Sequence, residues 1–113
     1  MNTKELLQDI QNFLYSGRYQ TEFVPDPVVR ILNACMLFER HLYKHFGQVT
    51  KDNFNNFYNL LYQFTSSITL DKFQEASHNL EPWQKEIILR NLGKILENCT
   101  ECEMSSYVKI LIN

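Results

Sequence analysis

The segment DPVVRILNACMLFERHLYKHFG, residues 26–47, carries a helix signal at both ends. Asp26 is a residue type that caps helix N-termini, Pro27 suits the first helical position, and Gly47 supplies a stop. The segment therefore predicts one long amphipathic helix over residues 27–46. Its apolar stripe contains an acid, Glu39, and the position of this acid among apolar residues requires an explanation.

The chain has only 3 Gly and 3 Pro among 113 residues, and they lie near the predicted ends of helices. The segment 103–112 fits a helix better than a strand. We expect a single all-α domain over residues 1–113, folded as a compact orthogonal or up-and-down bundle of five to six helices. The other predicted helices run from a cap at Thr3 to Ser16-Gly17, from Thr50 or Asp52 to about Phe64, from Thr69 to about His78, and from Pro82 to about Asn98.

The composition is that of a globular chain, with 44% hydrophobic and 21% charged residues. The net charge of −2 and the dispersed Lys and Arg argue against nucleic-acid binding, which needs a concentrated basic surface. No apolar run reaches the roughly 20 residues that span a bilayer. The first ten residues include two acids and resemble no secretory signal. We expect a soluble protein that is cytoplasmic or otherwise intracellular.

The predicted helix after Thr50 has more apolar surface than a peripheral helix needs. Its large side chains cover about 200° of the helix circumference, and the remaining narrow stripe of Asn and Gln carries no charge. Either neighbouring helices contact it on two sides, or part of the surface receives another protein chain. For the second interpretation the candidate partner-binding residues are Tyr58, Tyr62 and Phe64.

A second candidate surface lies on the predicted helix that starts at Pro82. Trp83 and Ile87 fall on the side opposite its main apolar stripe, together with Arg90. Trp and Arg are the residue types that most often anchor protein interfaces. The alternative is that Trp83 folds back over the preceding loop.

Glu39 is predicted to be a buried charge, because it lies near the middle of an arc that includes Cys35, Tyr43 and Phe46. An isolated buried carboxylate is too costly to remain ionised. Three outcomes are open: pairing with an arginine such as Arg18 or Arg90, protonation, or exposure where the helix end leaves the core. Buried charges are usually paired, so we favour the first outcome and a structural role.

Two pairs of residues have the spacing of zinc ligands. His41 and His45 are one helical turn apart, and Cys99 and Cys102 are separated by two residues. Together they form an alternative zinc site, although structural cysteines are favoured. We predict no metal and no cofactor. No nucleophile elbow or phosphate-binding glycine loop is present, so the expected function is non-enzymatic.

The run FYNLLYQFTSSITLDKF, residues 57–73, resembles the helix, turn and Leu-Thr-x-x-x-Phe segment of TAF-homology domains of transcriptional coactivators. The resemblance covers under a third of the chain, and the proline-rich segment that follows in those domains is reduced here to Pro82. It implies a small helical module that binds a partner helix.

The favoured function is a protein–protein interaction protein, acting as a regulator, inhibitor or adaptor through an aromatic helical surface. Its partner is expected to be another protein. That partner could contribute a helix, and a homo-oligomer of this chain is also possible. The alternatives are a small zinc-binding protein and a helical module similar to transcription cofactors.

Overall fold

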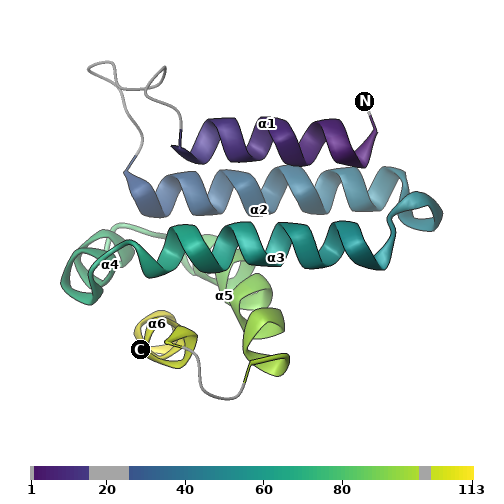
Figure 1. Ribbon diagram of the computed structural model, residues 1–113. Helices are drawn as coiled ribbons and strands as arrows, with labels where there is room; N and C mark the ends of the chain where they lie inside the picture. Colours follow the sequence, from purple (N-terminus) through teal and green to yellow (C-terminus); the bar gives the residue numbers. More distant parts are fainter. Residues whose placement is uncertain (1, 16–25, 100–102) are drawn as a thin grey trace.

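The computed structural model describes residues 2–15, 26–99 and 103–113 (Figure 1). Within these ranges the chain is all-α, with six α-helices, one 3₁₀ turn and no strand, which confirms the predicted fold class. None of the described helices is long and apolar enough to cross a membrane. The elements are α1 (Thr3–Tyr15), α2 (Pro27–Lys44), η2 (Phe46–Gln48), α3 (Lys51–Ser66), α4 (Leu70–Ser77), α5 (Pro82–Glu97) and α6 (Met104–Ile112).

Helix α1 packs against both α2 and α3, and the three helices alternate in direction, as in an up-and-down bundle (Figure 1). Helix α5 packs against both α2 and α3, and α6 packs against α5 and α4. In the same view α6 is seen end-on, so the second half of the chain crosses the first three helices rather than continuing their direction. The fold therefore combines the two predicted bundle types.

A single hydrophobic core includes residues from all six α-helices, which makes the described chain one compact domain. Its centre holds a stacked aromatic pair, Phe38 of α2 and Phe57 of α3, with ring centroids 4.0 Å apart. Phe73 of α4 packs edge-on against Tyr107 of α6. Tyr107 also donates a hydrogen bond to the carbonyl of Ile68, which fastens α6 to the turn between α3 and α4.

Side-chain caps start three of the six described α-helices where the sequence predicts them. The carboxylate of Asp26 accepts from the backbone N–H of Val28 at 2.8 Å, and the hydroxyls of Thr50 and Thr69 cap α3 and α4. The predicted cap at Thr3 is wrong. Asn2 accepts from the N–H of Glu5 at 2.9 Å, so the helix is already capped one residue earlier and Thr3 is buried within its first turn.

The C-terminal end of α2 also differs from the prediction. The helix ends at Lys44 rather than continuing to residue 46, and the turn η2 follows. Phe38 is the last buried residue of α2. Beyond it Tyr43 and Phe46 are 89% and 78% exposed, so they do not line a buried arc around Glu39.

Candidate partner-binding site

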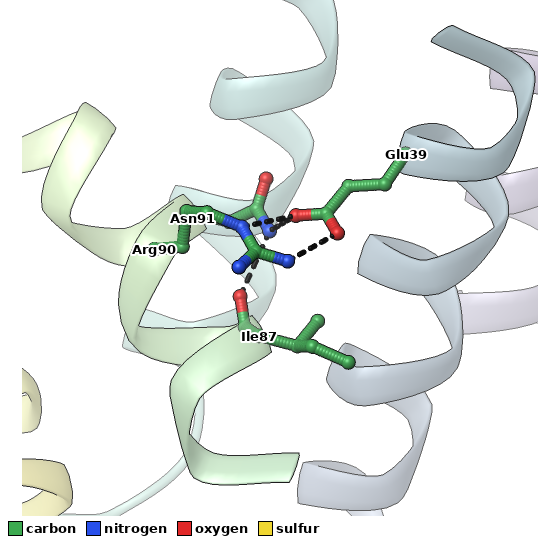
Figure 2. A network of polar contacts seen from close by, with 4 residues as sticks. All are labelled: Glu39, Ile87, Arg90 and Asn91. Carbon is green, nitrogen blue, oxygen red and sulfur yellow. Dashed lines mark hydrogen bonds and ion pairs between the residues drawn. The ribbon is translucent and has the colours of Figure 1, made fainter. Parts of the chain in front are cut away.

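Glu39 of α2 receives three hydrogen bonds from α5 (Figure 2). The guanidinium of Arg90 donates through Nε to Oε2 at 3.0 Å and through Nη2 to Oε1 at 2.6 Å. The amide of Asn91 donates to Oε2 at 2.8 Å and to the carbonyl of Ile87 at 2.9 Å. The predicted pairing of Glu39 with an arginine is confirmed for Arg90, whereas Arg18 lies outside the described residues.

This contact is partly open to water, since the side chains of Glu39 and Arg90 are 28% and 50% exposed. The hydrogen bond to Glu39 raises the pKa of Arg90 above its ordinary value, while partial burial acts in the opposite direction. Cys35, one turn before Glu39, is fully buried. Burial and, to a smaller extent, the charge of Glu39 raise the pKa of the Cys35 thiol, which therefore stays protonated. The contact fixes α2 against α5.

The structure separates the three candidate residues on α5. Arg90 is committed to Glu39, and the side chain of Ile87 is partly buried and points toward α2 (Figure 2). Their predicted place on a side away from the core is wrong, because α2 packs on that side of α5. Trp83 is 49% exposed, and its indole N–H donates to the carboxylate of Glu81. Of the three, Trp83 remains available to a partner.

An open cavity of about 500 Å³ lies between α3 and α5. We call it the tyrosine groove, because the partly buried Tyr58 and Tyr62 line it one helical turn apart. Burial is the main cause that raises the pKa of Tyr58, so its hydroxyl stays a neutral hydrogen-bond donor and acceptor. The described residues that line the groove include no charged side chain; they are Asn55, Tyr58, Asn59, Tyr62, Ile95, Asn98 and Cys99.

Phe64 does not belong to this surface. It is buried in the core and packs edge-on against the ring of Tyr15 from α1, with centroids 5.4 Å apart. The expectation that Phe64 contacts a partner is therefore corrected. Because α1 runs beside α3, it covers the part of the aromatic arc that contains Phe64.

The exposed face of α3 carries an uncharged run of amides, which we call the amide stripe: Asn55, Asn56, Asn59 and Gln63. Within the described part of the chain, none of these four side chains forms a hydrogen bond. Asn59 borders the tyrosine groove on one side. On the other side it borders a cavity of about 310 Å³ against α1, which Gln8 and Gln11 also line.

The described residues of the alternative zinc site, His41, His45 and Cys99, do not form a metal-binding group. His41 Nε2 lies 2.8 Å from the hydroxyl of Thr3, and its ring is 4.6 Å from that of His45, centroid to centroid. Cys99 instead lines the tyrosine groove, and Cys102 lies outside the described residues. Across the described ranges, no three His, Cys, Asp or Glu side chains are placed to hold one metal ion.

Sequence reasoning missed two internal partners, Asn91 and Thr3. A signal for Asn91 exists, since it falls beside Ile88, Leu92 and Ile95 on the apolar side of its helix, where an amide needs a hydrogen-bond partner. Thr3 carries no comparable signal, because its role depends on which end of α2 packs against α1.

In comparisons with known proteins, no family model, no curated protein and no solved structure matches the chain.

Proposed function

We propose that this chain is a non-enzymatic protein–protein interaction module that contacts its partner through the tyrosine groove. The observation that carries the proposal is the lining of the groove, which combines two partly buried tyrosines with amides and, among the described residues, no charged side chain. The centre of a protein interface is typically enriched in aromatic residues and depleted in Lys and Glu. The groove matches that composition on a chain that is otherwise 21% charged.

The shape of the site supports a helix as the contacting element. A groove between two helices, with Tyr58 and Tyr62 spaced by one turn, suits an amphipathic helix that places its apolar face between them. Ile95 supplies apolar surface from the α5 side. The amide of Asn98 donates to the carbonyl of Lys94 at 3.2 Å, which restrains its orientation at the edge of the groove.

Binding at this surface suits a regulator, inhibitor or adaptor. Tyrosine gives a large contact area at low conformational cost and keeps a polar hydroxyl for hydrogen bonding. Trp83 offers a second exposed aromatic, but it does not line the groove. The two surfaces can therefore be tested separately.

The test is photo-crosslinking in the cells of origin, followed by binding of purified proteins. A benzophenone amino acid replaces Tyr62 in one variant and Gln74, an exposed residue of α4, in a matched control. We expect a protein that crosslinks at position 62 and not at position 74. Its binding to the purified chain should weaken by about tenfold or more in Tyr62→Ala, because truncation of an anchoring aromatic costs at least about 1–2 kcal/mol.

Trp83→Ala and Gln74→Ala are measured in the same binding assay. Unchanged affinity in Gln74→Ala and reduced affinity in Tyr62→Ala support the groove. If only Trp83→Ala weakens binding, the partner uses the N-terminal end of α5 and the assignment to the groove is wrong. If no protein crosslinks at position 62 and Tyr62→Ala binds normally, the proposal fails.

A further inference from the structure

The end of the bundle where α2 turns into α3 carries the most exposed aromatic side chains of the described chain. Tyr43 in the last turn of α2 and Phe46 in η2 have the greatest exposed fractions among its large apolar residues. A single exposed apolar residue is common on a protein surface, and Leu70 and Trp83 are examples here. This end differs because two largely exposed rings lie within four residues of each other.

The same end carries an excess of positive charge, although the whole chain has a net charge of −2. The start of α1, the end of α2 and the start of α3 meet there, and residues from all three line one cavity of about 200 Å³ (Figure 1). Glu39, one turn before Tyr43, is neutralised by Arg90. The other charged side chains of this end are exposed, four cations and two acids: Lys4, Arg40, Lys44, Lys51, Glu5 and Asp52.

The four cations are available to an external anion. Ion pairs in the described part of the chain join Arg90 to Glu39 and Lys94 to Glu97, and none involves a cation of this end. Of the two acids, Glu5 accepts a hydrogen bond from the amide of Asn2. The surface therefore presents unpaired positive charge beside two exposed aromatic rings.

Exposed aromatic rings among lysines and arginines suit the surface of an anionic membrane. The rings enter the boundary between headgroups and acyl chains, while each Lys or Arg near the surface raises the partition coefficient by roughly fivefold. Tyr43 and Phe46 line neither the tyrosine groove nor the cavity between α1 and α3. Because a fluid lipid surface has no fixed shape, it accepts protruding rings without a matching pocket.

We propose that the chain binds the surface of an anionic phospholipid membrane through this end. We call the contacting surface the aromatic tip, and it consists of Tyr43, Phe46, Lys4, Arg40, Lys44 and Lys51. The two rings insert, and the four cations contact the anionic headgroups. The inference goes beyond the proposed function, because the aromatic tip and the tyrosine groove share no residue.

The first test is co-sedimentation of the full chain with lipid vesicles. Phosphatidylcholine vesicles with about one-third phosphatidylserine should bind the chain, pure phosphatidylcholine vesicles should bind it much less, and added salt should weaken binding. Lys44→Gln combined with Lys51→Gln should lower the partition coefficient by roughly 30-fold. The matched control, Lys72→Gln with Lys109→Gln, removes the same charge from exposed sites on α4 and α6 and should bind almost as tightly as wild type.

The second test locates the inserted side chains. Tyr43→Ala combined with Phe46→Ala should lower the partition coefficient by at least about tenfold. Thermal unfolding should stay unchanged, because both side chains are exposed in the folded chain. In a chain that carries Tyr43→Trp and Trp83→Phe, indole emission should shift to shorter wavelength on phosphatidylserine vesicles, whereas the emission of wild-type Trp83 should not.

The inference is overturned if the wild-type chain does not bind phosphatidylserine vesicles. It is also overturned if the two lysine pairs lower binding equally, or if the emission of the Tyr43→Trp chain does not shift. Binding to a single-stranded RNA oligonucleotide without binding to vesicles would make the aromatic tip a nucleic-acid surface instead. None of these measurements involves the tyrosine groove, so their failure leaves the proposed function standing.

Discussion

Helices α2 and α3 lie next to each other and meet through the stacked Phe38 and Phe57, yet they use their polar side chains differently. On α2, Arg30 donates to the carbonyl of Leu14 at 3.1 Å, Glu39 binds α5, and His41 contacts Thr3 of α1. On α3, the four amides of the stripe form no hydrogen bond within the described chain. Three polar residues of α2 thus contact α1 or α5, whereas the amide stripe of α3 makes no such contact among the described residues.

The largest effect is expected from Phe57→Ala, which removes the apolar anchor of α3. The side chain is fully buried, so the variant should lose about 3–5 kcal/mol of unfolding free energy, as measured by denaturant titration. Phe38→Ala should cost a similar amount, and the double variant less than the sum, because the two rings share one contact. A loss below about 1 kcal/mol for Phe57→Ala would show that α3 is not anchored at this stack.

Glu39→Gln should have a smaller effect, a loss of about 1–2 kcal/mol. The substitution weakens a charge-assisted contact, but Arg90 is half exposed and regains water, which limits the cost. A double-mutant cycle with Arg90→Gln measures the coupling between the two side chains by chemical denaturation. Unchanged stability together with lost partner binding would give Glu39 a role in recognition. The polar residues of α2 would then not differ in role from the amide stripe of α3.

The environment of His41 should make stability depend on pH. Burial, and then the neighbouring His45, lowers the pKa of His41 below its ordinary value of 6.5. The folded state thus binds fewer protons than the unfolded state, and stability is fully present above 6.5 and declines as the pH falls through the lower folded value. Unfolding measured between about pH 7.5 and 5 should show this decline, and His41→Gln should flatten it. A decline that persists unchanged in His41→Gln would assign it to other groups.

The smallest effect is expected from Asn56→Ala on the amide stripe. Ala is the better helix former, so the variant should be as stable as wild type or up to about 0.5 kcal/mol more stable. The measurement is the free energy of unfolding from an equilibrium denaturant titration. A loss of more than about 1 kcal/mol would reveal an internal contact of the amide and remove the difference between α2 and α3.

Features set by neighbouring residues were predictable from the sequence. The starts of α3 and α4 follow from Thr50 and Thr69, because a capping side chain acts on a backbone N–H within three residues. The pairing of Glu39 with Arg90 was also accessible, since an acid in an apolar arc needs a cation and the chain offers few arginines.

Features set by the arrangement of helices were not predictable in the same way. A helical repeat shows that a side chain is apolar, but not how far the neighbouring helices reach. Phe64 is buried because α1 lies over it, whereas Tyr43 is 89% exposed although it belongs to the same apolar arc as Cys35. The tyrosine groove follows from how α5 crosses α3, which no local pattern contains.

Trp83 is the single tryptophan of the chain, and this makes it a built-in optical reporter. Its indole is held by Glu81 at the start of α5 and lies apart from the tyrosine groove. Emission of the indole is therefore expected to report the opening of α5 during unfolding rather than contact at the groove. Tyr58 and Tyr62 are two of the six tyrosines, so a comparison of tyrosine emission between wild type and Tyr62→Ala is needed to isolate the signal of the groove from the signal of unfolding.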